Sequence, residues 1–226
     1  MGAYTYSQGL EWAVEAGTVT DEATALRWIV DQLEWNLGRY EAPLLLRLME
    51  AWKVPQDAER WPGDTAIELN AEYLATRETA ELRAETLQMG YSMKRLMHEL
   101  GDFPPGLLEE IAVTCPRSGV PGTQSAPAPT FLYVWTCAAS AWEISGKDAL
   151  TAWLWSWAEN QTMAALKAVP LGQAAGQRIL QEIGRRIPAV VERALALDES
   201  QFSNFAPGFA IACCNHETQY TRLFRS

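Results

Sequence analysis

Apolar residues recur at helical spacing along most of the chain. After Asp21 they follow the i, i+3, i+4, i+7 order of one helix face, at Leu26, Ile29, Val30, Leu33 and Leu37. Asp21 stands at the position of an N-cap, and Gly38 stands where this helix would end. No stretch sustains the alternation of apolar and polar residues that is typical of a strand. The pattern predicts an all-α fold.

Further helices are predicted between the prolines and glycines of the chain. They cover residues 8–16, 43–52, 64–103, 107–113, 131–142, 146–169, 171–183, 188–197 and 206–214. The run that begins at Asp64 fits either one helix or two helices joined near Thr76. Gly90 within this run costs about 1 kcal/mol relative to alanine, which indicates a close helix crossing. From the usual length of a helix, we expect a single-domain bundle of roughly eight to ten helices.

Three segments depart from this regular pattern. Residues 131–142 are apolar on nearly every face, which predicts a buried central helix. Residues 115–130 are rich in proline, glycine and serine and lack apolar periodicity, so we predict a mobile loop there. In the next helix Trp153 and Trp157 share one face, whereas Trp155 points to the opposite side. That helix is either fully buried or meets another protein with one of its sides.

The C-terminal stretch 216–226 is unusually rich in large side chains for a chain end. It carries two aromatic residues, a leucine, two arginines and one of the only two histidines of the chain. If it is helical, Tyr220, Leu223 and Phe224 line one face. That face either packs on the chain's own core or is presented to a partner.

Composition narrows the possible partners. The chain has 226 residues, 48% of them hydrophobic, with a formal net charge of −10 and a pI near 4.8. Binding to nucleic acid or to an anionic membrane relies on lysine and arginine, so neither is expected. The chain opens without a charged and apolar leader, and no apolar run reaches the roughly 18 residues of a membrane span. We therefore expect a cytoplasmic protein.

The sequence offers no recognisable active site. His98 and His216 are the only histidines, and no glycine-rich phosphate loop is present. Cys213, Cys214 and His216 come nearest to a metal cluster, and such ligands suit nickel or zinc. Adjacent cysteines do not have the spacing of structural zinc sites, however, and they follow an apolar run, which favours core packing. We predict no catalytic residue, no metal site and no cofactor.

Four stretches carry a resemblance to a known family. The C-terminal sequence HETQYTRLFRS at 216–226 resembles the end of the UreF family, the urease accessory proteins. The stretches GAYTYSQGLE at 2–11, TRETAELRAE at 76–85 and KAVPLGQ at 167–173 resemble three further motifs of that family, in the same order. Together they span nearly the whole chain. In the family further residues precede the first motif, so we also expect a segment ahead of Met1.

The resemblance implies a non-enzymatic scaffold for nickel insertion into urease. Such a protein would form a homodimer, bind UreD (UreH in some organisms), recruit the GTPase UreG and engage the urease apoprotein. Its tail, 215–226, would be flexible alone and become ordered on UreD, and Trp155 would lie at or near the dimer interface. The matching positions that would contact partners are Tyr4, Tyr6, Lys167, His216, Glu217, Tyr220, Arg222, Leu223, Phe224 and Arg225.

Several alternatives stay open at this point. The charged stretch 77–85 is interpreted first as a solvated helix face, and second as a face that meets a neighbouring element or subunit. Arg222 or Arg225 could act as an arginine finger that stimulates UreG. The chain could instead carry nickel on Cys213, Cys214 and His216, or be an all-α hydrolase with a deep polar pocket.

Overall fold

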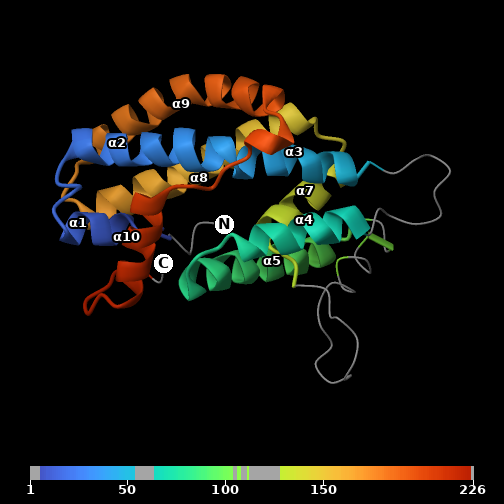
Figure 1. Cartoon of the computed structure of the whole chain (residues 1–226), viewed down its shortest axis with the longest axis horizontal. Helices are drawn as coiled ribbons and strands as arrows, with labels where there is room; N and C mark the ends of the chain where they lie inside the picture. Colours follow the sequence, from blue (N-terminus) through green and yellow to red (C-terminus); the bar gives the residue numbers. More distant parts are fainter. Residues whose placement is uncertain (1–5, 54–63, 104–105, 108–110, 112–127, 225–226) are drawn as a thin grey trace. The chain divides into compact units, whose positions relative to one another are not determined.

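A computed structural model describes residues 6–53, 64–103, 106–107, 111 and 128–224 (Figure 1). Within these residues the chain forms nine α-helices and no strand. The helices are α1 (Leu10–Glu15), α2 (Glu22–Asp31), α3 (Glu41–Ala51), α4 (Asp64–Ala75), α5 (Ala80–Leu100), α7 (Phe131–Ala141), α8 (Gly146–Ala168), α9 (Gln173–Ala196) and α10 (Pro207–Glu217). A short π-helix, η1 (Gln32–Asn36), continues from α2, and two short 3-10 helices are η2 (Leu37–Arg39) and η3 (Glu199–Gln201). The predicted all-α fold is confirmed.

The chain divides into two compact units. The first contains Met1–Pro43, Glu78–Leu82 and Leu150–Ser226, and the second contains Leu44–Arg77 and Arg83–Ala149. The predicted mobile loop at 115–130 lies mostly outside the described residues, as does most of the helix expected at 107–113. The single domain and the flexible tail at 215–226 stay predictions. No described helix has the length and apolar character that crossing a membrane requires.

In the first unit α2 begins as its sequence predicts. The Asp21 carboxylate accepts a hydrogen bond from the Thr24 backbone N–H at 2.8 Å, and the Thr24 hydroxyl accepts one from the Asp21 N–H at 3.0 Å. This capping box satisfies two donors of the first helical turn. The hydrogen bonds from Thr24 hold the pKa of the Asp21 carboxyl below its usual value.

Helix α9 differs from the prediction of two helices at 171–183 and 188–197. It is one continuous helix, with Pro188 in its interior. A proline there removes one backbone hydrogen bond. The buried face nevertheless continues without a break on both sides of it, at Ile179, Ile183, Ile187, Val190, Val191 and Ala194. Burial of this face against neighbouring helices, including α2, outweighs the lost bond.

The second unit is built around α7. Its side chains are mostly buried, as predicted, and the Trp52 indole N–H donates to the Thr136 hydroxyl at 3.0 Å. The run from Asp64 is two helices, α4 and α5. A Cβ atom added to Gly90 would lie 2.3 Å from the Pro129 carbonyl oxygen, so the predicted close approach is present, against the segment that leads into α7.

Candidate functional site

The site begins at α10, which packs on α1 in the first unit. The buried side of α10 contains Phe209 and Cys213, which form an apolar cluster with Leu82. Gly9 has a φ of 78°, and an added Cβ there would lie 3.1 Å from the Cys213 backbone nitrogen. Only glycine adopts this conformation readily at so close an approach. This packing fixes the orientation of the last turn of α10.

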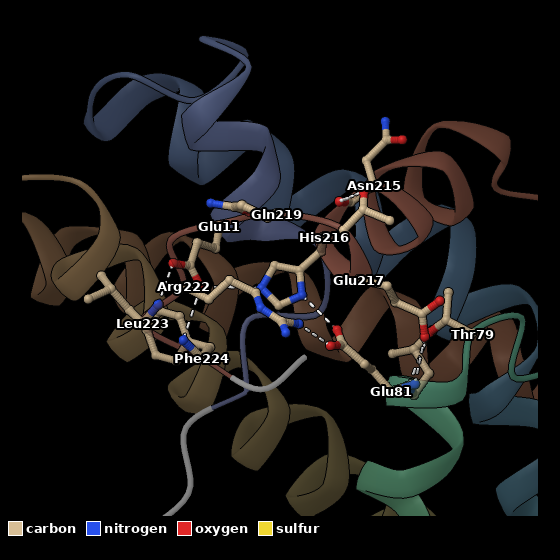
Figure 2. A network of polar contacts seen from close by, with 12 residues as sticks. Glu11, Thr79, Glu81, Asn215, His216, Glu217, Gln219, Arg222, Leu223 and Phe224 are labelled. Atoms are coloured by element: carbon tan, nitrogen blue, oxygen red, sulfur yellow. Dashed lines mark hydrogen bonds and ion pairs between the residues drawn. The ribbon is translucent and has the colours of Figure 1, made fainter.

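His216 on this last turn is buried between two carboxylates. Its ring is 1% exposed, with Nδ1 2.7 Å from Glu81 Oε2 and Nε2 3.3 Å from Glu11 Oε2 (Figure 2). Glu11 comes from α1 and Glu81 from the first turn of α5. The His216 ring thus connects Glu11, which is buried, with Glu81, which is partly exposed.

Glu11 also binds the main chain of the C-terminal segment. Its Oε1 accepts a hydrogen bond from the Leu223 backbone N–H at 2.6 Å, and its Oε2 accepts one from the Phe224 N–H at 3.0 Å (Figure 2). The Glu11 residue is only 6% exposed. A buried carboxylate needs several donors to compensate for lost hydration, and here the tail backbone supplies two of them.

Glu81 connects the same segment to the start of α5. Its carboxylate pairs with the Arg222 guanidinium, as well as with His216. The Glu81 backbone N–H donates to Glu217 Oε1 at 3.0 Å, and the Leu82 N–H donates to the Thr79 hydroxyl at 3.1 Å. Carboxylates at a helix N-terminus interact favourably with the helix dipole. We refer to Glu11, Glu81, His216 and Arg222 as the tail-binding cluster.

The described part of the tail, residues 218–224, is not a helix, so Tyr220, Leu223 and Phe224 do not line one helical face. Phe224 is buried, with Lys167 Nζ 5.8 Å from its ring centroid, whereas Tyr220 and Leu223 are 103% and 67% exposed. The physical reason lies in the backbone. The N–H groups of Leu223 and Phe224 donate to Glu11 and not to carbonyls four residues earlier, as they would in a helix.

The described N-terminal residues lie along α8. The backbone nitrogen and oxygen of Tyr6 bond to the Asn160 amide at 3.3 and 2.8 Å. The Gln8 carbonyl Oε1 accepts hydrogen bonds from Trp157 Nε1 at 2.8 Å and from Gln161 Nε2 at 3.3 Å. Tyr6 itself is buried. Two other predicted contact residues, Tyr4 and Arg225, lie outside the described residues.

Trp155, the residue predicted at the dimer interface, lies on α8, which contributes no residue to the tail-binding cluster. It is 37% exposed, while Trp153 is buried. Its ring covers Gly184 of α9, where an added Cβ would lie 3.2 Å from Trp155 Cζ3. One side of α8 therefore leaves part of a large aromatic side chain in solvent. Its place in a dimer interface stays a prediction.

The thiols and Arg222 are among the groups that the sequence offered for metal binding or catalysis. Across the described residues, no group of three or more His, Cys, Asp or Glu side chains is placed to hold a metal ion. Cys213 is buried and Cys214 is exposed, so the two thiols point to different surroundings. Burial also raises the pKa of the Cys137 thiol well above its usual range, which makes it unreactive. Arg222 is paired with Glu81 in this conformation.

Two central members of the cluster were not singled out by sequence reasoning. Glu11 and Glu81 both lie inside stretches that carry the family resemblance, at 2–11 and 76–85. Their positions in those motifs could have identified them as candidate site residues. For Glu81 the structure favours the second interpretation of the charged stretch, because its side chain lies against α10 and the tail.

Comparison with known proteins agrees with these motifs. A model of the UreF family matches residues 19–184. A protein of Azoarcus sp. (strain BH72) named urease accessory protein UreF is 54% identical over 230 residues, a match that covers 100% of this chain and 90% of the relative. A protein of the same name from Dechloromonas aromatica (strain RCB) is 55% identical over 228 residues, covering 100% of this chain and 92% of that relative. The chain belongs to the UreF family of urease accessory proteins.

Proposed function

We propose that this chain is a non-enzymatic scaffold for urease maturation. It binds UreD (UreH in some organisms), recruits the GTPase UreG and brings both to the urease apoprotein for nickel insertion. It works in the cytoplasm as a homodimer, with Trp155 at or near the subunit contact. Family membership supports the link to urease.

The observation that carries the partner-binding part of this proposal is the exposure of the tail. Tyr220 is fully exposed and Leu223 is 67% exposed, although the residues around them are held by the tail-binding cluster. Tyrosine is one of the residue types enriched in binding hot spots, and Tyr220 is exposed on a segment that the cluster holds in place.

The test is capture of UreD by two forms of the chain. One is full length, and the other ends at Thr218, which retains α10 and His216 but removes the tail. We expect the shortened chain to lose UreD binding while it keeps its helical content, and to melt at a lower temperature because Glu11 loses two hydrogen-bond donors. Equal capture by both forms would contradict the proposal.

The role of the GTPase needs a separate measurement. Arg222→Ala and Arg225→Ala can be compared for their effect on GTP turnover by UreG in the assembled complex. A scaffold predicts that turnover per assembled complex is unchanged, because Arg222 already pairs with Glu81. A lower turnover in a complex of unchanged composition would favour an arginine finger.

A further inference from the structure

We propose that Glu11 and Glu81 are positioning residues for the C-terminal segment. They hold Arg222 and the backbone at 223–224 on the domain, so that Tyr220 and Leu223 form the partner contact. The partner surface that fits this pair is apolar and uncharged. The identity of the partner as UreD rests on the proposed function, whereas the anchoring itself does not.

The first step concerns how the segment is held. Glu11 accepts hydrogen bonds from two backbone N–H groups, so these bonds do not depend on the side chain at position 223. Leu223 is thereby held through its backbone while its side chain stays in solvent. Removing the donors would leave a buried carboxylate poorly compensated, so the cluster and the docked tail stabilise each other.

The second step concerns the tail side chains that make contacts within the first unit and are therefore not available to a partner. Phe224 is buried in the first unit, and Arg222 forms its ion pair with Glu81. The Gln219 side-chain amide donates to the Thr221 carbonyl at 3.0 Å, which closes a local turn at Tyr220. Two of the tail's large side chains, Arg222 and Phe224, are therefore occupied within the domain, and two others point outward.

The third step concerns charge and preorganisation. Between Thr218 and Phe224 the sole charged side chain is Arg222, which is neutralised by Glu81 although the whole chain carries a net charge of −10. The outward pair thus presents an uncharged surface to an apolar partner surface. Fixing such side chains before binding reduces the ordering entropy that association must overcome.

The tail is predicted to be flexible, and it is docked in this structure. Both statements hold if the tail is in equilibrium between a released form and a docked form. If the docked form binds the partner, the apparent affinity scales with the docked fraction. Variants that weaken anchoring should then weaken binding by the factor by which they lower the docked fraction. Saturating partner should restore the docked tail of an anchoring variant.

The anchoring is tested by hydrogen exchange of the isolated protein, with Glu11→Gln and Glu81→Gln as variants. A glutamine at position 11 has one acceptor oxygen, and its amide group would face a donor. We expect protection of the Leu223 and Phe224 amides to fall about tenfold or more in Glu11→Gln. Glu15→Gln, an exposed position on the same helix, is the matched control and should change nothing. Unprotected amides in the unaltered chain, or equal protection in Glu11→Gln, would overturn the proposal.

The partner contact is tested by UreD affinity. Tyr220→Ala with Leu223→Ala should reduce it about tenfold or more while leaving the amide protection unchanged. Arg222→Gln should lower protection and affinity together, and it serves as the second anchoring variant if Glu11→Gln does not fold. Unchanged affinity in the Tyr220 and Leu223 double variant overturns the contact assignment. Absence of UreD binding by the unaltered chain would instead refute the proposed function, and the exchange result would still decide the anchoring.

Discussion

Replacing Gly90 by alanine tests the closest backbone approach in the second unit. The new methyl carbon would lie 2.3 Å from the Pro129 carbonyl oxygen, 2.8 Å from the Thr130 carbonyl carbon and 3.0 Å from the Phe131 nitrogen. All three are backbone atoms, so no side-chain rotation relieves the overlap. The opposing segment is also fixed, because the Thr130 N–H donates to Asn70 Oδ1 at 3.0 Å.

Two opposing free energies set the size of the effect. Alanine is favoured over glycine inside a helix by about 1 kcal/mol. Inserting a methyl group into a packed contact costs about 1–3 kcal/mol, and more where the neighbours are rigid. Since the three nearest atoms are all backbone, we take the upper end of that range. The net prediction is a loss of about 2 kcal/mol in the free energy of unfolding.

The assay is urea denaturation followed by circular dichroism, with Gly208→Ala as the control. Gly208 lies in the first turn of α10, and an added Cβ there meets no atom within 4 Å. Its replacement should leave the stability unchanged or raise it by up to about 1 kcal/mol. Both substitutions replace a helical glycine by alanine. A loss of unfolding free energy in Gly90→Ala that is absent in Gly208→Ala is therefore due to the steric overlap at Gly90. If Gly90→Ala is as stable as the unaltered chain, the close approach is not present in solution.

Three further predictions follow from other contacts. Thr136→Val removes the acceptor of the buried Trp52 indole N–H and should lower the unfolding free energy by about 1–3 kcal/mol, measured by urea denaturation. Thr65→Val at an exposed position of α4 is the control and should not. Asp21→Ala should lower the melting temperature at neutral pH. Because Thr24 depresses the pKa of Asp21 in the folded state, this difference should shrink as the pH falls below the usual value of 3.8, and a pH-independent difference would contradict the capping assignment. Trp155→Asp should convert the proposed dimer to a monomer by light scattering, and an unchanged mass would remove Trp155 from the interface.

The sequence was most informative where a local pattern determines the structure. The apolar spacing after Asp21, together with the capping residue itself, located the start of α2. Gly90 indicated a close crossing because glycine inside a helix is unfavourable unless space is needed. Pro188 led to a wrong prediction of two helices, because the prediction used only its local effect on the backbone. Its effect on the backbone is visible in the sequence, whereas the burial on both sides that outweighs it is a tertiary property.

The tail-binding cluster could not be built from local patterns, because its members lie at positions 11, 81, 216 and 222. The helical spacing of Tyr220, Leu223 and Phe224 predicts a helix, and this prediction holds only if no other group accepts hydrogen bonds from the backbone N–H groups of the segment. Glu11 is such an acceptor, and it takes two N–H groups that a helix would use internally. A charge-assisted hydrogen bond contributes about 1.5–3 kcal/mol, compared with about 0.5–1.5 kcal/mol for a neutral one, so two bonds to a buried carboxylate outweigh one more helical turn at a chain end. The distant acid thus sets which tail side chains are buried and which face solvent.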